Sequence, residues 1–469
     1  MIMQQLSPQD AQFLYIETGN NLTHVMGVNI YDPSTAPGGK VRFKDIIEHV
    51  ESRLFSSPVF KRRLMRLPYD FDHPYWVEDE FFDIEHHMFH GRLPEPADWR
   101  QLCIHLSRHF SRPMDMNRPL WDMYVIEGLD HIEGIPKGCY AIATRVHHAA
   151  IDGASAMHFF SAMSDRDRKG TPAIDLTPTT EDLGESPSTL TVVNRAVISN
   201  VQSPVKFAST LLRFSPAIWN TITKSLSSGE GSGRKVPLTR FNQAVSPHKM
   251  FDATIFKLKD LKRIKNKIEG ATINDVVIAI CAGALRSYLN EHDELPVEPL
   301  VAIAPVNARS SGSEAEIPGN NISAMSVAMP TYEEDALERL QIIRDTTRQT
   351  KAAKSGISAR LMTDLSKHVP AATLAGVARL IAGGRFTKKL CNLFISNVPG
   401  PQQTLYMNGA KLLHTFGMAP LADGMGLFIA TPSYNGEMTF NIISDREMLP
   451  DIEFFSECLE ESFEELLKA

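Results

Sequence analysis

The chain has 469 residues, 43% of them hydrophobic and 22% charged, which is an ordinary globular balance and enough length for two domains. A formal net charge of −7 argues against a general nucleic-acid-binding protein, although it leaves room for a local basic patch that binds phosphate. The five cysteines are scattered, odd in number and free of any Cys-x-x-Cys pair, so we expect no disulfide framework, no cysteine zinc site and a reducing compartment.

The first part of the chain alternates predicted helices and strands. Apolar residues at helical spacing predict helices over 43–54 and 98–113, the second ending near a proline. Aromatic and β-branched residues predict strands over 119–129 and 138–150. The N-terminus lacks the features of a signal peptide, and no apolar run reaches the roughly 20 residues that span a bilayer.

The character of the chain changes after residue 175. The next segment is rich in proline and threonine, contains a helical stretch over 192–226 and ends in a Gly/Ser-rich run. We therefore expect an N-terminal domain over 1–180, a partly helical linker over 181–245 and a C-terminal domain over 246–469.

The C-terminal part again mixes strands and helices. Predicted helices begin at 259, at Thr272 and at Ile452, the last with a clear amphipathic pattern. Predicted strands cover 250–258, 299–309, 321–330, 390–401 and 437–445. The fold class is therefore α/β or α+β, with sheets covered by helices.

The stretch TRVHHAAIDGASAMHFF, residues 144–160, lies where a predicted strand ends and a helix begins. Imidazole is the side chain best suited to move a proton near neutral pH, and strand ends present side chains at an edge. The residues themselves leave two interpretations open. His147 and His148 could serve catalysis, with Asp152 orienting one of them, or they could be satisfied polar groups beside an aspartate that caps the helix.

The pattern His-His-x-x-x-Asp-Gly resembles the signature of the CoA-dependent acyltransferases, which include chloramphenicol acetyltransferase and peptide-synthetase condensation domains. Within that superfamily the chain is similar to the bacterial wax ester synthase/diacylglycerol acyltransferase family. The resembling segments occur in the family's order and span nearly the whole chain. The resembling segments are LSPQDAQFLYIE (from Leu6), RPLWDMYVIEGL (Arg118), RVHHAAIDGAS (Arg145), TINDVVIAICAGALRSYL (Thr272), APVNAR (Ala304), SNVPGP (Ser396) and PSYNGEMTFNIISD (Pro432).

This resemblance implies two chloramphenicol-acetyltransferase-like domains, each a mixed sheet flanked by helices, with an active-site channel between them. It implies that His148 is the general base, that His147 supports it, and that Asp152, followed by Gly153, is a structural brace paired with Arg309. The implied substrates are a fatty acyl-CoA and a long-chain alcohol or diacylglycerol. No permanently bound cofactor and no metal are expected.

A thioester attack builds negative charge on the carbonyl oxygen, so a hydrogen-bond donor should face it. The resemblance marks the pair Asn274–Asp275 as important, with Asn274 as the donor and Asp275 as a supporting residue; the alternative is that Thr272 or Asn274 caps the helix that starts there, with Asp275 favouring its positive end. Ser396 and Asn397 are a second donor candidate, and Pro399 and Gly400 are interpreted as a turn.

Basic and histidine-rich clusters need their own interpretation. Arg385, Lys388 and Lys389 could meet CoA phosphates or anionic lipid, with a solvated basic face as the alternative. His86, His87 and His90, and separately His105 and His109, have a spacing that could suit a metal. They lack a telling third ligand, so we interpret them as solvated histidines.

Other enzyme classes lack their motifs here. There is no Gly-x-Ser-x-Gly elbow and no dinucleotide or P-loop glycine fingerprint. The remaining alternatives are a superfamily member that acylates another hydroxyl or an amine, and a lipid-binding relative without activity. Because the implied substrates are apolar, we expect a cytoplasmic protein associated peripherally with the membrane or lipid inclusions.

Overall fold

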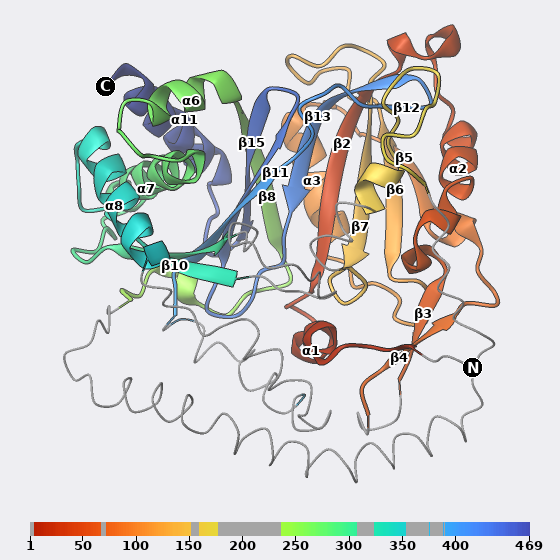
Figure 1. Ribbon diagram of the computed structural model, residues 1–469, viewed down its shortest axis with the longest axis horizontal. Helices are drawn as coiled ribbons and strands as arrows, with labels where there is room; N and C mark the ends of the chain where they lie inside the picture. The colour runs from red at the N-terminus through yellow and green to blue at the C-terminus, as the bar shows by residue number, and fades with distance from the viewer. Residues whose placement is uncertain are drawn as a thin grey trace.

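The computed structural model describes residues 4–66, 72–151, 159–176, 236–306, 323–352, 375, 388 and 390–469. Within these ranges, two six-stranded mixed sheets stand side by side, and a small three-stranded sheet lies at one end of the first (Figure 1). Helices pack against the sheets, so the predicted α/β class is confirmed. In the described part of the chain, no helix combines the length and the apolar character that crossing a membrane requires.

The N-terminal sheet is antiparallel except at one edge, where its last two strands run parallel. Its strands, in spatial order, are β12 (Tyr406–Met407), β13 (Ala410–Met418), β2 (His24–Asp32), β7 (Tyr140–His147), β6 (Trp121–Glu127) and β5 (Met88–Arg92). The small sheet consists of β1 (Gln4–Gln5), β4 (Tyr75–Glu78) and β3 (Arg62–Met65). The strands predicted over 119–129 and 138–150 are thus central members of this sheet.

The C-terminal sheet has parallel strands at its centre and antiparallel strands at its edges. In spatial order it contains β10 (Ser323–Met329), β9 (Leu300–Val306), β11 (Leu393–Pro399), β14 (Leu427–Tyr434), β15 (Glu437–Asp445) and β8 (Lys249–Lys257). The strands predicted at 250–258, 299–309, 321–330, 390–401 and 437–445 all fall here. The strand β14 was not predicted, because its apolar run is interrupted by Thr431 and Pro432.

One hairpin crosses from the second half of the chain to the first sheet. The strands β12 and β13 follow β11 in sequence, yet β13 pairs with β2 from Gly27↔Gly417 to Asp32↔Lys411. Figure 1 shows this late segment lying directly beside β2, the first long strand. A division of the chain at residue 246 therefore separates the two sheets except for residues 406–418.

Helices from the second half of the chain cover the outer face of the C-terminal sheet. Helices from the first half lie around the N-terminal sheet (Figure 1). Their bounds are α1 (Pro8–Ile16), α2 (Phe43–Glu51), α3 (Trp99–Phe110), α6 (Leu258–Lys265), α7 (Ile273–Glu291), α8 (Ala336–Ala352) and α11 (Ile452–Lys468). The predicted helix over 98–113 stops at Phe110, before the proline. Its start is fixed by Asp98, whose carboxylate accepts a hydrogen bond of 2.8 Å from the backbone N–H of Gln101.

The helix α7 is the centre of the C-terminal core, and Val276 to Leu285 along it are buried. It packs against α11 so closely that a Cβ at Gly283 would overlap the hydroxyl oxygen of Ser462. A glycine is therefore required at this crossing, because any larger side chain would push the two helices apart.

Candidate active site

The two adjacent histidines leave the end of β7 in different environments. His147 is the last residue of the strand and is 0% exposed, whereas His148, the next residue, is only half-buried. Successive residues of a strand point to opposite faces, so the two imidazoles cannot share one environment. Of the two, only His148 offers surface to a substrate.

His147 is held by three hydrogen-bonding neighbours. Its Nδ1 accepts from the backbone N–H of Ala149 at 3.1 Å, and its Nε2 lies 2.7 Å from the Glu17 carboxylate and 3.0 Å from the Thr23 hydroxyl. Because Nδ1 is an acceptor, we assign the ring proton to Nε2, which donates to Glu17. The histidine thereby has a fixed tautomer and a fixed ring orientation.

Glu17 is kept ionised by the donors around it. Burial raises the pKa of Glu17, but hydrogen bonds from His147 and Thr23 outweigh burial and hold this pKa below its ordinary value. The same carboxylate oxygen accepts from the Thr23 hydroxyl at 2.8 Å and the Thr23 backbone N–H at 3.2 Å. The segment from α1 to β2 is thus tied to the end of β7.

His148 is positioned by the same segment. Its ring stacks on Phe13 of α1, with centroids 4.1 Å apart and planes inclined by 14°. Its backbone N–H donates to the Thr23 carbonyl at 3.1 Å. Because Phe13 also lies in the Leu6 motif, one short segment orients both histidines.

A buried ion pair lies on the same face of the sheet as His147. Arg145 of β7 binds Asp122 of β6 through two hydrogen bonds of 2.5 and 3.0 Å, and donates to the carbonyls of His109 and Arg112 at 2.7 Å each. Burial raises the pKa of Asp122, but the bonds from His109 and Arg145 outweigh it and lower the pKa to about 2. This pair fixes β7 against β6 and α3.

The loop after His148 is tied to the small sheet. Arg62 of β3 donates to the Ala150 carbonyl at 2.9 Å while its guanidinium lies over the ring of Trp76, 4.4 Å from the centroid. The remaining motif residues Asp152 and Gly153, and the expected partner Arg309, lie outside the described residues.

At the start of α7, capping accounts for Asp275. Thr272 is the N-cap, its backbone N–H donates to the Asp275 carboxylate at 2.7 Å, and the N–H of Asp275 donates back to the Thr272 hydroxyl at 3.3 Å. Asp275 also accepts from the Thr347 hydroxyl at 2.7 Å. Asn274 lies in the first turn, half-buried, and within the described part of the chain its side chain has no hydrogen-bonding partner.

The second donor candidate lies on the central strand β11. Ser396 and Asn397 are both half-buried and, being consecutive, point to opposite faces. The predicted turn is partly wrong, because β11 continues through Pro399. A Cβ at Gly400 would overlap the Ser433 carbonyl oxygen, so close approach of backbone requires this glycine. Of the basic cluster, Lys388 is half-buried, whereas Arg385 and Lys389 lie outside the described residues.

Several histidines differ from the solvated interpretation. His87 is 3% and His109 6% exposed, so that interpretation is wrong for both. His24 is also fully buried; it bonds the Phe110 carbonyl at 2.7 Å, and burial together with the charge of Arg145 lowers its pKa to about 3. Across the described ranges, no group of three His, Cys, Asp or Glu side chains could hold a metal ion.

The sequence analysis missed Glu17, Asp122 and Arg145 as members of the site. All three stand inside segments that carry the family resemblance, and a signal existed in each case. A glutamate directly after a helix, and an arginine two residues before a histidine on a buried strand, are charges that need partners. The sequence did not say which partners, because Glu17 and His147 are 130 residues apart.

Comparison with known proteins places the chain in a family. The model of the wax ester synthase/diacylglycerol acyltransferase catalytic domain matches residues 6–277, and that of the WS/DGAT C-terminal domain matches residues 318–467. The O-acyltransferase WSD of Acinetobacter baylyi is 30% identical, over 98% of this chain and 96% of its own length.

Solved structures extend the comparison to the fold. A wax ester synthase/diacylglycerol acyltransferase from Marinobacter aquaeolei VT8 aligns with a TM-score of 0.72 and 29% identity, covering 99% of this chain and 98% of its own. A trichothecene 15-O-acetyltransferase of Fusarium sporotrichioides, at 12% identity and a TM-score of 0.61, covers 99% of this chain and 94% of its own and shares the fold. The chain therefore belongs to the wax ester synthase/diacylglycerol acyltransferase family and is an acyltransferase.

Proposed function

We propose that the protein transfers a long-chain fatty acyl group from acyl-CoA to the hydroxyl of a long-chain alcohol, of diacylglycerol, or of both, with His148 as general base. The observation that carries this proposal is the contrast in burial between the two histidines. His147 is fully enclosed and bonded through both ring nitrogens, whereas His148 keeps exposed surface at the end of β7. The names of the relatives support the class of substrates.

The reaction needs one proton acceptor and no covalent enzyme intermediate. His148 takes the proton of the acceptor hydroxyl as its oxygen attacks the thioester carbonyl carbon. The tetrahedral intermediate collapses, the carbon–sulfur bond breaks, and the thiolate of CoA takes the proton back from the imidazolium. The products are an ester and free CoA.

Neighbouring residues position this base. Stacking on Phe13 and the backbone bond to Thr23 limit the movement of His148, so that little reorganisation is needed during the proton transfer. His147 acts indirectly. Its hydrogen bond to the ionised Glu17 keeps the end of β7 in one conformation. We assign His147 and Glu17 as positioning residues.

The proposal also assigns roles to residues away from the histidines. Asn274 is the first candidate for the oxyanion donor, since its half-buried amide is not used in capping α7. Ser396 and Asn397 are the second. Asp152 and Arg309 would brace the motif loop, and Lys388 with Arg385 and Lys389 would meet CoA phosphates or anionic lipid at a membrane or inclusion surface.

An acceptor panel tests the substrate class. Palmitoyl-CoA is offered with hexadecanol, with diacylglycerol, with a short-chain alcohol and with a long-chain amine, and both thiol release and lipid product are measured. We expect release of CoA with matching ester from the first two acceptors. Product only from the amine or short alcohol would indicate another reaction of the superfamily, and absence of thiol release with every acceptor would indicate a lipid-binding protein without activity.

The role of His148 is tested by His148→Ala, with His131→Ala as the control. Loss of a general base lowers the rate by about 10²–10⁴-fold. The side chain of His131 is 58% exposed and distant in sequence from the motif, so its removal should leave activity unchanged. A folded His148→Ala protein that forms ester at the wild-type rate would rule the mechanism out.

A further inference from the structure

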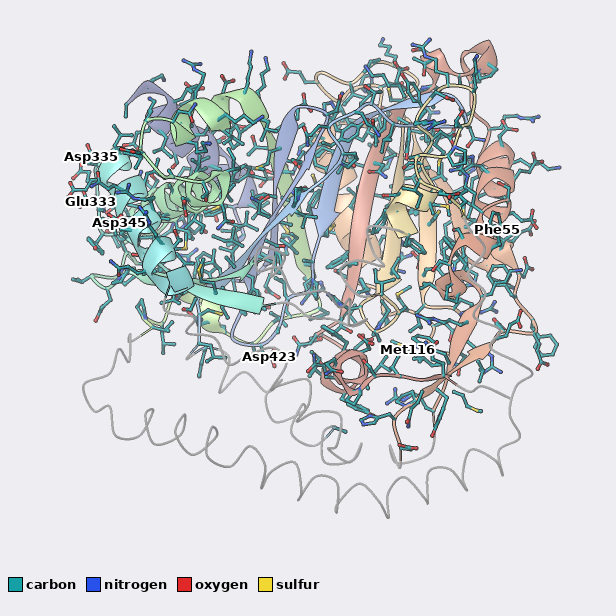
Figure 2. The ribbon with its side chains drawn as sticks, in the orientation of Figure 1. Phe55, Met116, Glu333, Asp335, Asp345 and Asp423 are labelled. Carbon is teal, nitrogen blue, oxygen red and sulfur yellow. The ribbon has the colours of Figure 1, made fainter. Side chains whose placement is uncertain are left out.

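The two histidine clusters of the sequence come together in one pocket. This pocket has a volume of about 560 Å³ and lies between the C-terminal end of α3, the loop that follows it, and the strands β5 and β6. Figure 2 labels Met116 in that loop, at the edge of the N-terminal sheet. Five histidines line the pocket: His86, His87, His90, His105 and His109.

Positive charge exceeds negative charge in the pocket. Four arginines and two aspartates line it. Asp122 is paired with Arg145 at 2.5 Å, and Asp115 with Arg118 at 3.4 Å. The two remaining arginines, Arg108 and Arg112, are exposed, and neither has a carboxylate within 4.0 Å among the described residues.

Burial and the excess of positive charge lower the pKa of two of the histidines. Burial lowers the pKa of His105, and the charges of His109, Arg108 and Arg112 lower it further. Burial likewise lowers the pKa of His109, and although Asp122 raises it, Arg145 and Arg112 lower it again. Near neutral pH these rings are therefore neutral donors or acceptors, and the uncompensated cations are the two arginines.

Hydrogen bonds hold three of the pocket's histidines in place. His109 is buried and bonds the Asp122 carboxylate at 3.1 Å, and His87 is buried and bonds the Trp121 carbonyl at 2.7 Å. His105 bonds the hydroxyl of Tyr124 at 2.8 Å. These contacts fix the floor of the pocket while Arg108 and Arg112 remain at its opening.

The geometry points to a binding site for a phosphate group, held by Arg108 and Arg112 over the histidine floor. Two guanidinium groups without carboxylate partners match the several oxygens of a phosphate better than a single carboxylate, because each can donate two parallel hydrogen bonds. The proposed acyl transfer uses none of the residues at the opening of this pocket, because its base, its oxyanion candidates and the basic residues named for CoA phosphates lie elsewhere.

Two sources could supply the phosphate: coenzyme A and the headgroup of an anionic phospholipid. Arg145 forms part of the wall and lies three residues before His148, about 10 Å along β7, with its side chain on the face of His147. A CoA molecule with its thioester at His148 would have to pass the end of β7 to place a phosphate in the pocket, and only this source rests on the proposed function.

The binding test uses inorganic pyrophosphate and the double variant Arg108→Gln/Arg112→Gln. The control is Arg100→Gln, which removes one positive charge from α3 at a residue outside the pocket whose side chain is 73% exposed. By titration calorimetry at low salt we expect binding to the wild type, binding at least about tenfold weaker in the double variant, and no change in the control. Thermal unfolding checks that all three proteins are folded.

The source is then identified by two further ligands. Free CoA that competes with pyrophosphate, with loss of competition in the double variant, assigns the site to CoA. Binding to phosphatidylglycerol vesicles but not phosphatidylcholine vesicles, lost in the double variant, assigns it to a lipid headgroup. A wild type that does not bind pyrophosphate, or a double variant that binds it as tightly, overturns the proposal.

These outcomes are separable from those of the catalytic test. If His148→Ala abolishes ester formation while pyrophosphate does not bind, only the phosphate site fails. If His148→Ala keeps full activity while the pyrophosphate results hold, only the proposed mechanism fails.

Discussion

The two large sheets have similar sizes but carry very different side chains on their central strands. The strand β7 of the N-terminal sheet buries Arg145 and His147. The central strands of the C-terminal sheet, β11 and β14, contain no charged residue at all. The chemistry of the site is therefore concentrated in one sheet, whose buried charges need specific partners to be tolerated.

The C-terminal sheet meets the N-terminal sheet through neutral hydrogen bonds, in addition to the pair of Glu437 with His414 at 2.9 Å. Thr439 of β15 donates to the Thr415 carbonyl of β13 at 2.9 Å, and Asn441 accepts from the Gly417 N–H at 3.3 Å. Hydrogen bonds between neutral groups each contribute little, whereas an ion left without its partner is costly. Mutations in the two sheets should therefore differ in their cost.

Removal of Asp122 should have the largest effect on stability. Asp122→Ala leaves Arg145 buried without a counter-ion, so the free energy of unfolding should fall by about 3–5 kcal/mol. Urea denaturation measures this, with the exposed Glu80→Ala as a control expected to change by less than about 0.5 kcal/mol. A loss below about 1 kcal/mol would mean that the pair is not the main constraint on β7.

Glu17→Gln should combine a smaller stability loss with a loss of activity. The amide keeps an acceptor for His147 but not the charge, so we expect a loss of about 1–2 kcal/mol and a kcat about tenfold lower. Because the folded-state pKa of Glu17 lies below its ordinary value of 4.5, ionised Glu17 stabilises the fold above that pH. The advantage over the variant should disappear as pH falls through the lowered folded pKa.

Two results would contradict this role of Glu17. An unchanged kcat at neutral pH, or a difference in unfolding free energy between wild type and Glu17→Gln that persists at low pH, would show that the carboxylate does not act through His147.

In the C-terminal domain, steric constraints should matter more than charge. Gly283→Ala places a methyl group against Ser462, and overpacking of this kind typically costs about 1–3 kcal/mol. The activity per folded molecule should be unchanged, since Gly283 faces Ser462 of α11 and lies nine residues after the candidate donor Asn274 on α7. Adding Ser462→Ala should recover part of the stability; no recovery would indicate that another contact at the crossing limits the packing.

The smallest effect per interaction is expected at the junction of the sheets. Thr439→Val removes two neutral hydrogen bonds, the one donated to the Thr415 carbonyl and the one accepted from the Asn441 amide, and each should contribute about 0.5–1.5 kcal/mol to the free energy of unfolding. Thr439→Ser, which keeps the hydroxyl, should lower it less. Equal losses in the two variants would assign the effect to packing of the methyl group.

Local patterns were enough to predict much of the fold. The periodicity of α11, the Thr272 cap of α7 and the β-branched run of β7 are each encoded within a few residues. The pairing of β13 with β2 was not predicted, because no local signal links strands nearly 390 residues apart.

The features of the site likewise divide into those encoded locally and those that depend on long-range packing. The family resemblance predicted His148 as the base and His147 as its support, and the structure adds that the two differ in burial. The partners Glu17 and Asp122, and the meeting of the two histidine clusters in one pocket, depend on long-range packing. The burial of His87 and His109 depends on it as well, so the lack of a third metal ligand in the sequence led to the wrong interpretation that both are solvated.

The crossing hairpin has a consequence for how the protein is made. On a ribosome, β2 emerges early, but its neighbour β13 is synthesised only when most of the chain has been translated. Until then, one edge of β2 has no partner and is open to pairing with other chains. The N-terminal sheet, and with it the histidine motif, is therefore completed only near the end of translation, and the two halves of the gene could not be expressed separately as two finished domains.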